Sequence, residues 1–485
     1  MEEGDVKQKQ LDMLDIVFIL LLGSLSFFKM YWLIWHPTGV VFDEVYFGNF
    51  SNYYIKSQYY HDIHPPLAKM VMFFVANLSE YDGTIDFVHN PTGYENPDYI
   101  QLRITPASFS AMCVPLVYLS VRFLGFSHIA AFTSGFLLLC DLSIGVEGRH
   151  ILSDGILHFF AVLHICVLFY TMSIPKLNGW FHFWHIMTGI TLGAASSCKN
   201  TAWGLAVLDA AAYIVYLYAI HKNNIIDYVF DVLLYGTTLF LINFLVYLLT
   251  FYVHFILLPI SGPGHVFLED PMKAQLLPNQ AINSSLHARR LKGPSLFTRT
   301  VVHTIKTHKG NMGIRQFHDS QSFPHHWPIL GSVVVYFWAQ EGREIRCIGN
   351  VFTYYYGLFC LIIQLFAYKK SNYIQAVLLA IGYSSCYFPF YLIPRVLYLY
   401  HYLIPLMIAC MSVGSAMDLY LPPKIKGICC IIMCATALFG FWLWMDYMYG
   451  TPMKDKEITI WNQNWIDGDL DHRKRRDEHY KSKNK

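Results

Sequence analysis

The sequence predicts an all-α polytopic membrane protein, on the strength of three observations. Of the 485 residues, 55% are hydrophobic, 17% are aromatic and only 14% are charged, whereas a soluble domain has about 25% charged residues. Apolar segments of about 20 residues, the length that spans a bilayer, recur along the chain. Short polar connections, most of them basic, separate these segments. The near-neutral net charge of +2 gives no reason to expect nucleic acid as a partner.

We predict about eleven transmembrane helices. The first follows a polar N-terminus, and because no small-residue cleavage site comes after it, we expect a retained span rather than a removed signal peptide. The fifth and sixth are the weakest, because glycines, serines, Lys199 and Asn200 interrupt them. The predicted spans are 13–35, 104–124, 128–146, 151–173, 181–198, 202–220, 228–256, 350–368, 373–393, 396–418 and 427–448.

Basic residues near the span ends predict the orientation. With a cytoplasmic N-terminus, the short cytoplasmic connections each carry positive charge, whereas the basic cluster near Arg473 argues for the other orientation. The chain then divides into an N-terminal membrane region (1–256) with a structured luminal loop (36–102), a second luminal loop (257–349), C-terminal membrane helices (350–448) and a charged tail (449–485). In the second loop, 329–338 is apolar but too short to span, which predicts a strand or an interfacial segment.

The 11 cysteines mostly stand singly within apolar runs and form no paired CxxC pattern. This usage is typical of small buried hydrophobic residues rather than of metal ligands. We therefore predict no metal site built on cysteine.

Asp43 and Glu44 come directly after the first span. Charged side chains so near the hydrocarbon boundary are costly and tend to be functional. A carboxylate at the mouth of an apolar cavity is partly desolvated, which raises its basicity and suits it to accept a proton from an attacking alcohol. The alternative is a pair of interfacial acids that anchor the end of the span.

The segment 61–66 (HDIHPP) follows in the same loop. Its two prolines fix the backbone and could hold His64 beside the cavity as a supporting residue. Two histidines and an aspartate also suggest a metal, but three ligands within four residues do not make a regular site. A purely structural turn is the alternative.

Several cations fall near the non-cytoplasmic ends of predicted spans. Arginine can bind a phosphate with two parallel hydrogen bonds, and several cations on one face suit such a group. Snorkelling to lipid head groups is the alternative for each cation alone. Asp154 is expected to pair with Arg149 or a similar cation. The candidate phosphate contacts are Arg103, Arg149, Lys199 and Arg395, with His401 and Tyr402 as inward-facing polar groups.

Four segments together give the chain a resemblance to a known family. They are 42–48 (FDEVYFG), 64–69 (HPPLAK), 261–264 (SGPG) and 395–405 (RVLYLYHYLIP). The four segments occur in the same order as in the protein O-mannosyltransferases, and the chain resembles this family. Its members use dolichyl phosphate mannose and have the GT-C membrane fold. The resemblance runs through nearly the whole membrane part.

The resemblance implies a function for the first-loop acids. Asp43 and Glu44 match the catalytic dyad of the family, with Asp43 as general base on a Ser or Thr hydroxyl of an acceptor protein. Mannose would leave dolichyl phosphate with inversion at the anomeric carbon. Arg103 matches a further functional position. The family implies a multi-pass protein of the endoplasmic reticulum membrane, or the plasma membrane of a prokaryote, that pairs with itself or another member. We expect neither a cofactor nor a metal.

Two features depart from the family pattern. Eukaryotic members carry a β-trefoil MIR domain in the loop after the seventh span, but here that loop has no trefoil-like repeat, so we expect a form without it. The C-terminal KSKNK fits a retrieval signal, which needs a cytoplasmic tail, whereas eleven spans predict a luminal one. We expect the match to be due to chance. Among three N-glycosylation triplets, Asn283 is the best candidate.

Three other functions stay open. A related GT-C transferase could use a lipid or glycan acceptor, and the quoted segments cannot separate it from a protein mannosyltransferase. A transporter or channel could use the buried charges, although the inverted repeats common in transporters are not evident. A non-catalytic partner in a heteromer is the third, and the intact acidic dyad argues against it.

Overall fold

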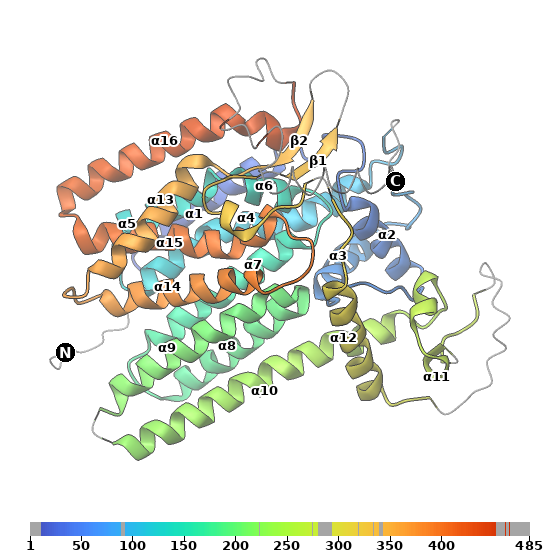
Figure 1. Ribbon diagram of the computed structural model, residues 1–485, viewed down its shortest axis with the longest axis horizontal. Helices are drawn as coiled ribbons and strands as arrows, with labels where there is room; N and C mark the ends of the chain where they lie inside the picture. The colour runs from blue at the N-terminus through green and yellow to red at the C-terminus, as the bar shows by residue number, and fades with distance from the viewer. Residues whose placement is uncertain are drawn as a thin grey trace, which may run out of the picture.

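The computed structural model describes residues 11–452, apart from 89–92, 223, 274, 280–292, 319, 333 and 339–342, together with Trp461 and Trp465. Long helices lie side by side in one bundle, and the short elements of the two large loops gather at the end opposite the N-terminus (Figure 1). We call that end the loop face. The predicted Asn283 site and the C-terminal KSKNK lie outside the described residues.

The bundle consists of α1 (Met13–Tyr31), α4 (Tyr99–Phe123), α5 (His128–Leu139), α6 (Leu142–Arg149), α7 (Asp154–Met172), α8 (Gly179–Cys198), α9 (Leu205–Ile220), α10 (Ile225–Leu257), α13 (Val351–Ile363), α14 (Tyr373–Tyr387), α15 (Leu403–Tyr420) and α16 (Pro423–Tyr449). The loop face carries α2 (Glu44–Ile55), α3 (Leu67–Leu78), α11 (Asp270–Lys273), α12 (Leu296–Met312), β1 (Val334–Trp338) and β2 (Glu344–Cys347).

The predicted all-α membrane fold is confirmed, and each predicted span coincides with a helix or a broken helix. Within the described chain, seven helices are long and apolar enough to cross a membrane, or eight if α5 and α6 form one bent span. The predicted eleven spans are therefore not confirmed. The helices α13 and α14 have 13 and 15 residues, which is short for a membrane span.

Two buried ionic contacts join α1 to the rest of the bundle. At the N-terminal end, Arg122 Nε of α4 lies 2.6 Å from Asp15 Oδ1. Near the other end, Lys29 Nζ donates to the carbonyl of Leu139 at 2.9 Å and to that of Asp141. Because the last carbonyls of a helix have no partner within it, the Lys29 ammonium stabilises the end of α5.

The break between α5 and α6 bends the path by 58°. Asp141 caps the new helix, since its Oδ1 accepts from the backbone N–H of Ile144 at 3.0 Å, as an N-cap carboxylate does. The bend directs the end of α6, with Glu147 and Arg149, into the interior below the loop face.

The second large loop contains a hairpin beside the bundle. The strands β1 and β2 are antiparallel, with Val334 opposite Cys347, so the predicted strand within 329–338 is confirmed. Beyond α16, the buried Trp465 donates from Nε1 to the carbonyl of Leu330 at 2.9 Å. Trp465 therefore lies on the loop face.

We expect Gly155→Ala to destabilise the protein. A Cβ at Gly155 would lie 2.7 Å from the carbonyl oxygen of Pro106, so α4 and α7 would have to separate, and overpacking of this kind costs about 1–3 kcal/mol. Thermal unfolding in detergent measures the effect. Gly236→Ala is the control, because nothing lies within 4 Å of that position. Equal melting temperatures for the two variants would contradict the close packing of α4 and α7.

Candidate active site

The site forms where the loop after α1 turns into α2. Phe42 has a φ of +49°, a left-handed conformation that is unfavourable for a bulky residue by about 1–3 kcal/mol and that often marks a functional position. Asp43 follows at the N-cap of α2, but its carboxylate makes no capping hydrogen bond. Within the described chain no group donates to this carboxylate. Asp43 therefore presents a carboxylate that the fold does not use.

Asp43 lies among charged residues from separate elements. Desolvation by the surrounding protein raises the pKa of Asp43 to about 6, while Lys199 opposes the shift and Asp154 adds to it. Arg395 also lowers the pKa of Asp43, which places its charge near the carboxylate. At neutral pH such a carboxylate is ionised and is a stronger base than an ordinary aspartate.

Glu44, the next residue, has a different role. Its side chain is fully buried and binds Arg103 through two hydrogen bonds, Nε to Oε1 at 2.7 Å and Nη2 to Oε2 at 2.8 Å. The backbone N–H groups of Val41 and Ile151 also donate to it, at 2.8 and 3.0 Å. Burial raises the pKa of Glu44, but Arg103 outweighs it and holds that pKa below its usual value. Glu44 is a structural anion in this geometry.

Two predicted phosphate contacts are likewise used by the fold. Arg103 directs its remaining N–H groups to the carbonyls of Pro37, Gly39 and Ile34 at 2.6, 3.1 and 3.5 Å, which occupies all five donors of the guanidinium. Arg149 donates to the carbonyls of Trp32, Leu33 and Met448 and is buried. These arginines hold the chain after α1, and their role in binding phosphate stays a prediction.

Lys199 and Arg395 are placed better for an anion. Lys199, at the end of α8, lies 2.9 Å from Asp154 Oδ1, and its ammonium stands 5.0 Å from the ring of Tyr400. Asp154 thus pairs with a cation as predicted, but with Lys199 rather than Arg149. Arg395 donates to the carbonyl of Val396 at 3.1 Å and to the Oδ1 of Asn311, and both acceptors are neutral.

The two remaining predicted polar groups, His401 and Tyr402, are adjacent in one short helical turn (Leu399–Tyr402). His401 is nearly buried and stacks on Trp327 with ring centroids 6.1 Å apart. Tyr402 is fully buried, and its hydroxyl lies 3.0 Å from that of Tyr383 within the helix core. Tyr402 therefore packs in the core at the start of α15, and its role near the donor stays a prediction.

His64 faces the same cluster from the turn before α3. Its Nδ1 is buried and has no hydrogen-bond partner among the described residues, and its carbonyl accepts from Lys69 Nζ at 2.8 Å. Burial, followed by the charges of Lys199 and Lys69, holds the pKa of His64 well below its usual range. A neutral imidazole with a free nitrogen can bind a substrate hydroxyl or phosphate oxygen.

Sequence reasoning missed Glu147 and Tyr400. Glu147 is buried at the end of α6, within electrostatic range of Asp154, Lys199 and Asp43. An isolated acid in an apolar segment (142–149) was the available signal. Tyr400 stacks on Tyr398 with centroids 5.2 Å apart and contacts Phe42 at 6.4 Å, but a tyrosine among many in an aromatic-rich chain gave no signal.

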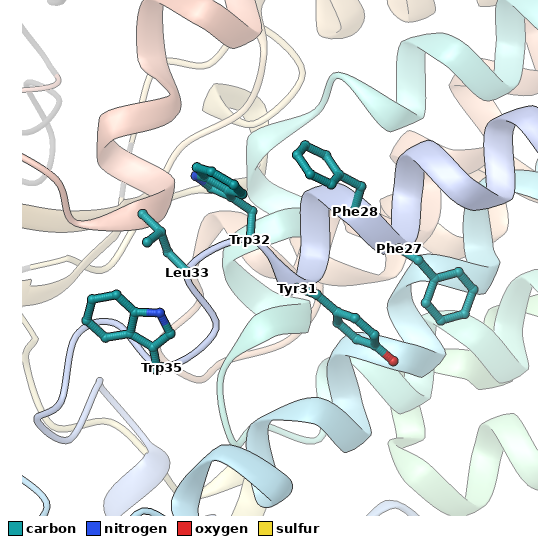
Figure 2. Close-up of a pocket in the computed structure, with 6 residues that line it drawn as sticks. All are labelled: Phe27, Phe28, Tyr31, Trp32, Leu33 and Trp35. Atoms are coloured by element: carbon teal, nitrogen blue, oxygen red, sulfur yellow. The ribbon is translucent and has the colours of Figure 1, made fainter.

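Two concave surfaces lie near the loop face. One, of about 430 Å³, is lined by Phe27, Phe28, Tyr31, Trp32, Leu33 and Trp35 at the end of α1 (Figure 2). It contains no acid or base and is typical of the aromatic belt at a membrane surface. The other, of about 660 Å³, includes Arg395 in its lining and so belongs to the surroundings of Asp43.

Among the described residues, one group could offer three metal ligands, namely Asp12, Asp15 and His128. It lies at the N-terminal end of α1, away from Asp43, and Asp15 already binds Arg122 there. This group is an ionic contact between α1, α4 and α5, and we assign no metal to it.

Comparisons with known proteins identify the family to which the chain belongs. The profile of dolichyl-phosphate-mannose-protein mannosyltransferases matches residues 20–259, and that of the C-terminal four-helix membrane region of protein-O-mannosyltransferases matches residues 297–468. Dolichyl-phosphate-mannose–protein mannosyltransferase 3 of Saccharomyces cerevisiae is 34% identical over 275 residues, which cover 54% of this chain and 35% of the relative. Protein O-mannosyl-transferase 2 of Danio rerio is 29% identical over 276 residues, covering 56% and 36%.

The matched region is therefore about a third of the length of these curated relatives. In structure, the chain is similar to a protein in the S. cerevisiae Pmt1–Pmt2 complex bound to the sugar donor, with a TM-score of 0.83 and 19% identity over 94% of this chain and 93% of that one. The archaeal oligosaccharyltransferase AglB of Archaeoglobus fulgidus gives a TM-score of 0.53 at 11% identity, over 96% and 59%. These structural likenesses concern the GT-C fold.

The adjacent acids should respond differently to loss of charge. Glu44→Gln leaves Arg103 buried without its counter-ion, which should destabilise the protein by about 3–5 kcal/mol. Asp43→Asn removes an unpaired carboxylate that the fold disfavours in its charged form, so stability should be unchanged or slightly higher. Thermal unfolding in detergent compares the two variants. An equal loss of stability in both would contradict the division of roles between them.

Proposed function

Because this chain belongs to the dolichyl-phosphate-mannose–protein mannosyltransferase family, we propose that it transfers mannose from dolichyl phosphate mannose to Ser or Thr hydroxyls of proteins. The observation that carries the proposal is the unpaired Asp43 carboxylate, which has an elevated pKa and faces Lys199 and Arg395. The neighbouring Glu44 is held by Arg103 and anchors the loop. Asp43 is thus the acid that remains available for chemistry.

In the proposed reaction, Asp43 accepts the proton of the acceptor hydroxyl as its oxygen attacks the anomeric carbon of the β-linked mannose. The bond between that carbon and the phosphate oxygen breaks, and dolichyl phosphate leaves with the electron pair. Attack opposite the leaving group inverts the configuration, which gives an α-mannosyl Ser or Thr. A positioned base of this kind contributes about 10²–10⁴ in rate.

The departing phosphate needs positive charge near the site. Lys199 and Arg395 supply it in this proposal. Among the described residues, Arg395 donates to neutral acceptors, and Lys199 forms its ion pair with Asp154. The free Nδ1 of His64 adds a neutral hydrogen-bonding group. Preorganised charges of this kind stabilise a developing anion. No cofactor or metal is proposed beyond the lipid-linked donor.

The chain is a multi-pass membrane protein, and we place it in the endoplasmic reticulum membrane with the loop face in the lumen. We infer this location from the eukaryotic relatives. The likeness to a protein of the Pmt1–Pmt2 complex supports pairing with a second family member or with another copy.

Transfer should depend on Asp43. With purified protein, dolichyl phosphate mannose and a threonine peptide, Asp43→Asn should lower kcat by about a hundredfold or more, while Asp43→Glu should retain part of the rate. Mass spectrometry of the peptide measures the product. Transfer by Asp43→Asn at the wild-type rate would refute Asp43 as the base, and transfer only to a lipid or glycan acceptor would refute the protein acceptor.

Activity should also fall on acidification, at a higher pH than for an enzyme whose base is an ordinary aspartate. Because the base works only when ionised and the pKa of Asp43 is raised to about 6, kcat/KM should decline as the pH falls through about 6, with the slope of one proton. An ordinary aspartate would keep its activity down to a pH of about 4. Thermal stability recorded over the same range separates this decline from acid unfolding. A flat profile down to about pH 4 would contradict the assignment.

A further inference from the structure

The groove whose lining includes Arg395 is built from two segments of the loop face. One wall comes from Arg315, Phe317 and 321–325 of the second luminal loop, and the other from 390–391 and 393–397, between α14 and α15. Two backbone hydrogen bonds join the walls, from Val396 N–H to the carbonyl of Ile314 at 3.0 Å and from Ser322 N–H to that of Leu397 at 2.8 Å. With a volume of about 660 Å³, the groove is large enough for a ligand of several residues.

Aromatic side chains link one end of the groove to Phe42, the residue before Asp43. Leu397 lines the groove, and the next residue, Tyr398, stacks on Tyr400 at 5.2 Å. Tyr400 in turn contacts Phe42 at 6.4 Å, and Phe42 directly precedes Asp43. A chain of three aromatic rings therefore connects the groove to the residue before the proposed base.

The other notable group in the groove is Arg315. Its side chain is exposed, and no described residue accepts a hydrogen bond from it or forms an ion pair with it. By contrast, Arg395 on the opposite wall already binds Val396 and Asn311. Arg315 is thus a free cation in the lining of a groove that leads to Asp43.

We propose that this groove holds an extended segment of the acceptor protein, and that Arg315 selects segments with an Asp or Glu near the modified Ser or Thr. The proposal rests on the proposed mannosyltransfer. A guanidinium pairs with a carboxylate through directed hydrogen bonds. The aromatic side chains of Phe317, Phe323 and Tyr391 supply apolar contact for the segment around the acidic residue.

A peptide fits the lining better than the isoprenoid of the donor. The polar side chains of Gln321 and His325 lie along the groove, and an apolar chain placed against them would cover polar groups without offering hydrogen bonds. An extended peptide brings its own amide groups and can bond to them. One wall also comes from the loop after α12, and this loop is not a membrane-spanning element.

The charge preference can be tested by reversing it. Acceptor peptides carry one threonine and a single Asp or Lys at successive positions on either side, and kcat/KM is measured with wild type, Arg315→Glu and Lys309→Glu. Lys309 is the matched control, because it is exposed on α12 of the same face but does not line the groove. Binding of the same peptides to the Asp43→Asn protein is followed by fluorescence anisotropy.

We expect wild type to favour Asp over Lys peptides by about two- to fivefold at a restricted set of positions, as an exposed ion pair gives. Arg315→Glu should invert this preference, and Lys309→Glu should preserve it. A wild-type enzyme indifferent to charge, or a preference that survives Arg315→Glu, would overturn the proposal. So would a rise in the KM for the donor alone, which would assign the groove to the lipid phosphate.

Failure of the two proposals can be told apart. Charge-dependent binding without any transfer would count against the mannosyltransferase activity while supporting the groove. Transfer whose binding and rate do not depend on peptide charge would support the mannosyltransferase activity and count against the groove. Melting temperatures of the three proteins confirm that each variant is folded.

Discussion

The buried pair of Glu44 and Arg103 is the interaction on which the geometry of the site depends. One carboxylate binds the guanidinium through two hydrogen bonds and accepts backbone N–H groups from Val41 and Ile151, so a single anion ties together the loop after α1, the start of α2, α4 and the approach to α7. A buried pair is weak evidence for net stability, but removing one partner is strongly destabilising. This pair therefore fixes the position of the loop, and with the loop in place Asp43 can remain unpaired.

Asp43 and Glu44 are neighbours in the sequence, but one has a chemical function and the other a structural one. Asp43 and Glu44 are adjacent and chemically alike, yet the backbone at Phe42 turns one side chain into the core and leaves the other among Lys199, Asp154 and Arg395. The same environment keeps His64 neutral. Groups that differ in charge state at one pH are what acid–base chemistry requires, and here burial and neighbouring charge produce the difference.

The apolar periodicity of the sequence was enough to predict the bundle and the structured first loop, because these depend on composition and local pattern. The catalytic role of Asp43 came from the family resemblance and stays a prediction. Partner choice was not predictable in the same way. Arg103 and Arg149 were expected to face a phosphate, but each donates to residues more than 60 positions away, and no local pattern reveals such contacts. The break at Asp141 depends on Lys29 from another helix, and Tyr402 turns inward because a short helical turn precedes α15.

The first helix carries a consequence for how the protein is made. Asp15 and Lys29 lie buried within α1, and their partners Arg122 and Leu139 are 107 and 110 residues further along the chain. Ionisable groups are costly within a membrane until they are paired. These contacts of α1 can therefore form only after the chain has been synthesised through α4 and α5. The final packing of the first helix thus depends on helices that are made later.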